Sequence, residues 1–227
     1  MRWNHPRHGL VGPGAFIEAA EENGAIVDIG RWVLHAACRQ AAAWQAASGT
    51  VLTMAVNVSS AQLEHAAFVE EVAAALAAHD LDPATIELEL TETAIARDLD
   101  AAACVLAALK GLGVRIALDD FGTGHSSLGR LKDLPLDTLK IPKPFVDRVA
   151  TSEEDLSIAR GIVGLAHGMR LSVVAEGIED GDQLARLVGI DCDYAQGFHL
   201  ARPAAPATIE AAFLPQPSEK RRATSGG

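Results

Sequence analysis

Seven polar side chains stand at or near the ends of six apolar segments, and their types suit the chemistry of a phosphate ester. They are Asn57, Glu89, Asp119, Asp120, Lys140, Glu176 and Gln196. The segments themselves are typical of buried strands, so solvent exposure alone is a poor explanation for six polar ends. Because the carboxyl ends of parallel strands meet at one rim, we expect these side chains to converge there.

Carboxylate and amide oxygens are ligands of hard cations, so this set suits Mg²⁺ or Mn²⁺ better than zinc. Asp119 and Asp120 are adjacent at the end of an apolar segment, where two carboxylates repel each other unless a cation neutralises them. Such a pair could bridge two cations about 3.5–4 Å apart, which clamp a phosphodiester and generate a hydroxide nucleophile. Lys140 would hold that water or stabilise negative charge. The residues alone leave two alternatives, a solvated acidic turn and a lysine that reaches solvent to pair with an acid.

Six strands alternating with helices are expected to position these groups. The expected strands are 52–59, 86–92, 114–120, 137–141, 171–177 and 193–198. Apolar residues at helical spacing predict helices between them, and residues 3–14 are expected to be a loop because His, Pro and Gly recur there without a period. Trp32 and Trp44 are expected in the core. The alternating order predicts a single α/β domain with a parallel barrel.

The composition of the chain argues against several classes of binding partner. A net charge of −11 and a pI of about 5.1 argue against broad binding of nucleic acid or of an anionic membrane. The sequence has no apolar run of bilayer-spanning length and no signal-peptide core at its start. Cys38, Cys104 and Cys192 are far apart in sequence, so neither a disulfide framework nor a zinc site is indicated. We expect a protein of the reducing cytoplasm.

The polar segments, taken together, resemble the successive motifs of the EAL domain family. The resemblance runs from Arg2 to about Pro206 and implies one EAL-type domain over residues 1–213, incomplete at its N-terminus, followed by a disordered tail over 214–227. The matching segments are Asn57-Val58-Ser59, Glu89-Leu90-Thr91-Glu92, Asp119-Asp120-Phe121-Gly122-Thr123-Gly124, Leu139-Lys140-Ile141, Glu176-Gly177-Ile178-Glu179 and Gln196-Gly197-Phe198.

This resemblance implies a modified TIM (β/α)8-type barrel that hydrolyses the bacterial second messenger cyclic di-GMP to linear pGpG with Mg²⁺ or Mn²⁺. Lys140 and Glu176 would be catalytic, Gln196 and Arg2 would contact the substrate, and Glu92 would tether the loop after Asp120. The metal ligands would be Asn57, Glu89, Asp119, Asp120 and Glu176.

Two departures from the family pattern bear on activity. The Glu-Ala-Leu motif, whose Glu is a metal ligand in the family, is absent from this chain. Pro142 stands where the family usually has Asp, and proline supplies no carboxylate. Each lost acid would cost about 10–100-fold in metal affinity or activity, so we expect impaired hydrolysis. The first two strands of the barrel are also expected to be missing, which would leave two open edges for a homodimer or another polypeptide.

Three interpretations follow for the whole chain. The first is an impaired EAL module that binds cyclic di-GMP, metal or partner proteins. The second is an active phosphodiesterase that a partner or an upstream segment completes, with an upstream sensor or diguanylate-cyclase-like domain as a further partner. The third is a gene remnant without function. Turnover with Mn²⁺ would favour the second interpretation, and binding without turnover would favour the first.

Overall fold

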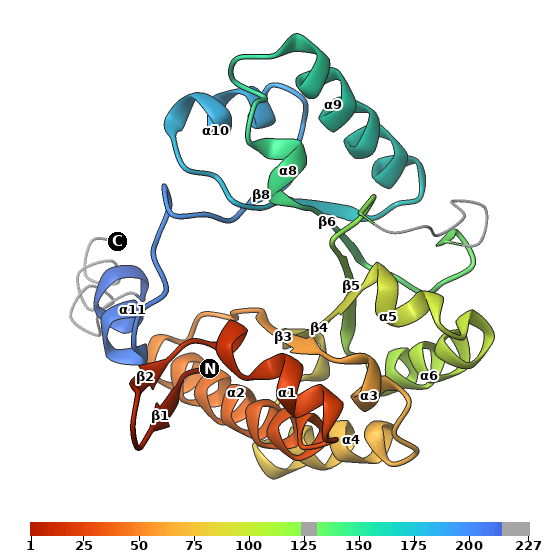
Figure 1. Ribbon diagram of the computed structural model, residues 1–227, viewed down its shortest axis with the longest axis vertical. Coiled ribbons are helices and arrows are strands. Elements are labelled where there is room, and N and C mark those ends of the chain that lie inside the picture. The colour runs from red at the N-terminus through yellow and green to blue at the C-terminus, as the bar shows by residue number, and fades with distance from the viewer. Residues whose placement is uncertain (124–130, 215–227) are drawn as a thin grey trace, which may run out of the picture.

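The computed structural model describes residues 1–123 and 131–214, and within them one curled parallel sheet organises the chain (Figure 1). The sheet has the strand order β3-β4-β5-β6-β7-β8, so each strand lies beside its neighbour in sequence. The six expected strands are therefore confirmed, with shorter bounds. They are β3 (Met54–Val58), β4 (Ile86–Thr91), β5 (Arg115–Asp119), β6 (Thr138–Ile141), β7 (Ser172–Ala175) and β8 (Tyr194–Ala195).

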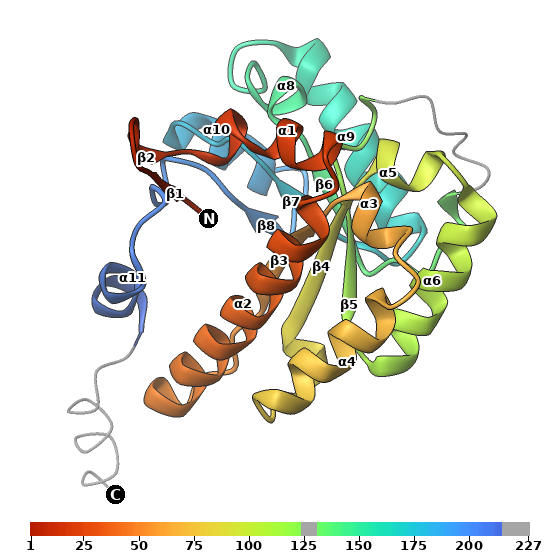
Figure 2. The ribbon, with the colours of Figure 1, turned by 60° about the horizontal axis from the view of Figure 1, so that its bottom comes forward.

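The helices that connect the strands lie on the convex side of this sheet, and none of them lies on its concave side (Figures 1 and 2). The longer ones are α2 (Ile26–Ser48), α4 (Phe68–Ala78), α6 (Leu99–Leu112), α9 (Glu153–Gly168) and α10 (Gly181–Val188). The shorter ones are α1 (Ile17–Glu22), α3 (Ser60–Leu63), α5 (Glu92–Ala96), α8 (Lys143–Val146) and α11 (Pro206–Phe213), with 3-10 turns η1 (Pro13–Ala15) and η2 (Pro83–Thr85). Such a parallel sheet with helices outside is the expected α/β architecture.

The two faces of the sheet differ in chemistry because side chains alternate along a strand. The outward residues are apolar and buried against the helices, as Leu88, Ile116 and Leu139 illustrate. They belong to two hydrophobic clusters, one between Leu34 and Leu134 and one between Leu139 and Ile190. The inward residues of β4, β5 and β6 are largely polar, and they carry the candidate site. The apolar face thus fixes which side chains point inward.

Two expectations for the first 48 residues are wrong. The segment expected to be a loop contains an antiparallel hairpin of β1 (Trp3–His5) and β2 (Gly9–Val11). Its turn is closed by the His5 ring, whose Nδ1 accepts hydrogen bonds from the main-chain N–H groups of residues 7 and 8. Trp32 is 60% exposed, because it lies on the face of α2 that points away from the sheet. Trp44 is half-buried, and its indole N–H donates to Glu210 of α11.

No helix in residues 1–123 and 131–214 is long and apolar enough to cross a membrane. The tail expected to be disordered lies, from residue 215 on, outside the described residues. Most of the loop after Asp120 also lies outside them, from residue 124 to residue 130.

Candidate active site

Lys140 lies at the centre of the candidate site and joins three carboxylates from three other segments. Its Nζ is 2.6 Å from Glu176 Oε1, 2.9 Å from Glu89 Oε1 and 3.3 Å from Asp119 Oδ2. The Lys140 side chain is only 4% exposed, so it does not reach solvent. The alternative of a lysine that leaves the strand for the surface is therefore wrong. The expected convergence of polar strand ends holds for these four residues.

The strand register explains this convergence. Glu89 and Asp119 lie on the inward face of β4 and β5, because their neighbours Leu88, Leu90 and Leu118 fill the outward face. Asn57 of β3 pairs in register with Glu89, and it is exposed at the inward side of the edge strand.

Glu176 is bound to the adjacent strand through its main chain. It follows β7 directly, and its N–H donates to the Ile141 carbonyl oxygen at 3.0 Å. Parallel pairing of β6 with β7 therefore brings the Glu176 side chain next to Lys140. The two catalytic candidates come from adjacent strand ends.

Asp120 completes a group of four carboxylates. Its backbone is left-handed, with φ at 55°, a conformation that Asp and Asn tolerate better than most residues. The Asp120 N–H donates to Asp119 Oδ1 at 2.9 Å, and the Asp120 carbonyl accepts from the Thr123 main chain and hydroxyl. This turn holds two adjacent carboxylates at the strand end.

The group has an excess of negative charge. Burial raises the pKa of Glu89, and repulsion from Asp119 and Glu176 adds to this, while Lys140 opposes it. Burial likewise raises the pKa of Glu176 and of Asp120. Burial lowers the pKa of the Lys140 ammonium, but its attraction to Glu89 and its hydrogen bonds with Glu176 and Glu89 outweigh this, so the pKa is raised. One ammonium faces four carboxylates.

This donor set fits a divalent cation. Four carboxylates and the Asn57 amide offer oxygen ligands. Burial, with repulsion between the carboxylates added to it, raises the pKa of Glu89, Asp120 and Glu176, and a bound cation would offset both effects. In the described residues, no three acidic, His or Cys side chains already stand in a metal-binding arrangement. Three of the four carboxylates, those of Glu89, Asp119 and Glu176, instead contact Lys140. A cation that binds the same oxygens would therefore displace contacts that Lys140 makes with them.

Glu92 makes the contact that a loop-tethering residue requires. Thr91 caps the N-terminus of α5 by accepting a hydrogen bond from the Ala94 N–H, and this places Glu92 in the first turn. The buried Glu92 carboxylate accepts the Gly122 N–H at 2.9 Å. The turn after Asp120 is thus bound to the end of β4. That this bond couples cation binding to the loop stays a prediction.

Comparison with known proteins assigns the family. The family model described as "EAL domain" matches residues 1–203. This chain belongs to the EAL domain family. It is 44% identical over 203 residues to the bifunctional diguanylate cyclase/cyclic di-GMP phosphodiesterase MucR of Pseudomonas aeruginosa, covering 89% of this chain and 30% of that protein. It is 41% identical over 210 residues to the cyclic di-GMP phosphodiesterase NbdA of the same organism, covering 92% and 27%.

The fold agrees with solved EAL domains. The structure of the MucR phosphodiesterase in complex with cyclic di-GMP superposes with a TM-score of 0.87 at 43% identity, covering 92% of this chain and 84% of that one. The expected barrel-type fold is therefore confirmed, as a curled parallel sheet with outer helices. This EAL domain spans less than a third of the length of the two curated relatives.

The two predicted substrate contacts of the EAL domain, Gln196 and Arg2, lie on different segments of the chain. Gln196 follows β8 and is exposed, and its main chain bonds to Ala175 and Ile178. Arg2 precedes the hairpin and lines a separate apolar pocket of about 390 Å³ with Trp3, Phe16 and Trp32 among its walls. No contact of the Gln196 or Arg2 side chain with the four carboxylates is present in the described residues.

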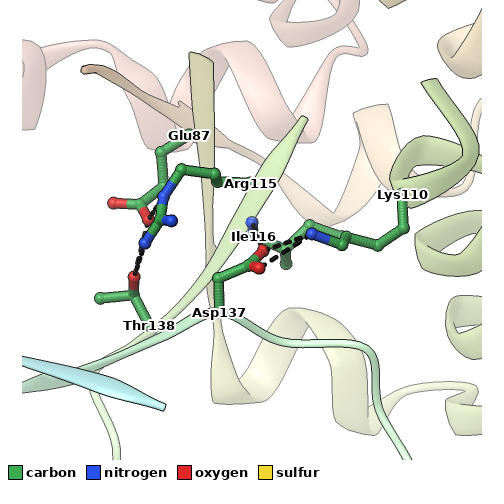
Figure 3. A network of polar contacts seen from close by, with 6 residues as sticks. All are labelled: Glu87, Lys110, Arg115, Ile116, Asp137 and Thr138. Carbon is green, nitrogen blue, oxygen red and sulfur yellow. Dashed lines mark hydrogen bonds and ion pairs between the residues drawn. The ribbon is translucent and has the colours of Figure 1, made fainter. Parts of the chain in front are cut away.

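Sequence reasoning missed a second polar cluster on the inward face, at the start of the strands (Figure 3). Arg115 Nε donates to Glu87 Oε1 at 3.1 Å, and the Thr138 hydroxyl donates to the same oxygen at 2.7 Å. Arg115 also donates to the Thr138 hydroxyl at 3.2 Å. Strand parity was the available signal, since Arg115 and Asp119 are separated by four residues and share a face.

Proposed function

We propose that this EAL domain binds cyclic di-GMP at the carboxyl ends of its strands and hydrolyses it with divalent cations, at a rate that Pro142 reduces. The supporting observation is the group of Glu89, Asp119, Asp120 and Glu176 around the buried Lys140. A cluster with this charge excess at a strand end is suited to cation-dependent phosphodiester chemistry. Two curated relatives are named as cyclic di-GMP phosphodiesterases, which supports the choice of substrate.

In this proposal the cation ligands are the carboxylates of the group and the Asn57 amide. When bound, Mg²⁺ or Mn²⁺ would neutralise charge on the phosphodiester and lower the pKa of a water molecule. The turn at Asp120 presents two of the carboxylates together, and the Glu92 bond to Gly122 fixes the start of the following loop. The protein itself thus supplies the arrangement of the ligands.

Lys140 and Glu176 act on the attacking water. The Lys140 ammonium is a hydrogen-bond donor that can hold a water molecule or a phosphate oxygen. The Glu176 carboxylate is the acceptor nearest to this ammonium, so it is the group placed to receive a proton from that water. Without a cation, their direct contact at 2.6 Å places donor and acceptor side by side.

Pro142 is the reason for a reduced rate. It directly follows β6 and is buried. A residue two positions after Lys140 in an extended strand faces the same side as Lys140, so an acid at position 142 would point toward the candidate site. Proline offers no side-chain ligand there and no main-chain donor. We propose that residues 1–213 act as one domain with this lowered activity.

The alternative is a fully active phosphodiesterase. The contacts of Lys140 favour it, because Glu89, Asp119 and Glu176 all lie within 3.3 Å of this lysine. The two proposals differ in what an acid at position 142 would change.

Product analysis with cyclic di-GMP and Mn²⁺ tests this function. We expect slow formation of pGpG that EDTA abolishes, and binding without turnover in Ca²⁺. Pro142→Asp should raise turnover about tenfold, as expected for a restored acid near the cations. Pro144→Asp is the matched control, because Pro144 is exposed in α8. It should leave turnover unchanged.

Two results would contradict the proposal. Rapid turnover by the unaltered chain, unchanged in Pro142→Asp, would replace impairment by full activity. Neither binding nor turnover in any of these cations would exclude cyclic di-GMP as the ligand.

A further inference from the structure

Lys140 uses oxygens of the same carboxylates that the proposed function assigns to the cations. Its contacts are with Glu176 Oε1, Glu89 Oε1 and Asp119 Oδ2. Each of these three oxygens thus already has the ammonium as a partner. The lysine and a divalent cation therefore share ligands.

We propose that the Lys140 ammonium is an internal counter-ion that holds the carboxylates together before a divalent cation binds, and that it competes with that cation for them. This inference rests on the cation site of the proposed function. It assigns Lys140 a second role, as a positioning residue, besides its contact with water or phosphate.

The charges at the site carry this argument. Removing the ammonium would leave Glu89, Asp119 and Glu176 close together and largely buried without a positive partner, which destabilises the cation-free fold. The same removal would eliminate the repulsion between the ammonium and an incoming Mn²⁺. Removal of the ammonium is thus expected to lower the stability of the cation-free protein and to raise its affinity for Mn²⁺. Two separate measurements can test these two effects.

Lys110 offers a matched comparison within the same fold. Its Nζ is 2.8 Å from both carboxylate oxygens of Asp137, so one ammonium meets one carboxylate (Figure 3). Lys110 lies on α6 and Asp137 directly precedes β6, at the opposite end of the strands from the Glu89, Asp119 and Glu176 carboxylates. A Lys→Met change there removes an ion pair of the same type without affecting the carboxylates of the site.

The experiment measures thermal unfolding in EDTA and the Mn²⁺ dissociation constant by calorimetry, on the full chain. Lys140→Met should lower the unfolding temperature in EDTA more than Lys110→Met does. It should also bind Mn²⁺ at least about tenfold more tightly than the unaltered protein, because a nearby positive charge is gone. Lys110→Met should bind Mn²⁺ with unchanged affinity.

A second variant covers the case in which Lys140→Met does not fold. The double variant Lys140→Met/Glu89→Gln removes one positive and one negative charge and so restores part of the balance. It should unfold at a higher temperature in EDTA than Lys140→Met alone, or fold where that variant does not. No recovery in the double variant would overturn the counter-ion role.

The outcomes separate this inference from the proposed function. If the unaltered protein binds Mn²⁺ and Lys140→Met binds it equally or more weakly, the competition is wrong while the cation site stands. If neither binds Mn²⁺, the cation site itself is wrong and the competition falls with it. Tighter binding together with lower stability in EDTA would support the proposal.

Discussion

Glu87 and Glu89 lie two residues apart on β4 and face the same side of the sheet, but their partners differ. Glu87 meets one guanidinium and one hydroxyl, from Arg115 and Thr138 (Figure 3). Glu89 shares one ammonium, that of Lys140, with two other carboxylates. The lower cluster, Glu87 with Arg115 and Thr138, is balanced in charge. The upper cluster, Lys140 with its carboxylates, is not.

Under the proposed function, this difference separates a structural cluster from a catalytic one. A balanced, hydrogen-bonded cluster satisfies its own polar groups and needs no ligand. A cluster with excess negative charge is costly when it is buried, and a cation offsets that cost. The same strand therefore has a charge-balanced polar pair near its start and, near its end, a group with excess negative charge that we propose binds a cation. This difference between the two ends of β4 agrees with the placement of active sites at the carboxyl ends of parallel strands.

The largest expected effect is loss of hydrolysis in the upper cluster alone. Asp119→Asn removes one charge from the proposed cation ligands and keeps the Oδ1 acceptor for the Asp120 N–H. We expect turnover of cyclic di-GMP to fall about hundredfold or more. Glu87→Gln is the control in the lower cluster and should keep turnover per folded molecule within about twofold. Equal losses in both variants would remove the functional distinction between the clusters.

A smaller effect is expected on stability when the lower cluster is broken. Arg115→Met leaves Glu87 largely buried without its positive partner. Arg115 is 34% exposed, so solvent screens part of the interaction, and we expect a loss of about 2 kcal/mol in the free energy of unfolding. Urea unfolding would measure it. The double variant Glu87→Leu/Arg115→Met should regain most of the loss, and a double variant as unstable as the single one would contradict the pairing.

The smallest expected effect has the opposite sign. Asp120→Asn relieves repulsion in the upper cluster, and Asn also tolerates the left-handed backbone at this position. In EDTA we expect a gain of about 0.5 kcal/mol in the free energy of unfolding. Asp137→Asn should instead destabilise the protein, because Asp137 binds Lys110 and the Ile116 N–H. A loss of stability in both variants would show that the upper cluster is balanced without a cation.

The hairpin shows where the sequence pattern was insufficient. Residues 3–14 carry His, Pro and Gly without a strand period, and yet β1 and β2 pair there. The deciding contact is the His5 ring, which accepts two main-chain N–H groups of the turn. Such a contact depends on the turn being formed, so periodicity does not reveal it. The expectation that Trp32 lies in the core failed for a related reason. The sequence pattern shows that α2 is a helix, but it does not show which side of the helix packs against the sheet.

The sequence alone determined the strand order, the family and the residues of the upper cluster. The alternation of side chains along a strand and the apolar runs determine which side chains face inward. The family motifs can be recognised from short stretches of sequence and from their order along the chain. Only the tertiary structure decided the contacts, namely that Lys140 meets three carboxylates and that Glu87 meets Arg115 and Thr138. The reason is physical. Charge balance depends on distances between strands, and parallel pairing brings together residues that are far apart in the sequence.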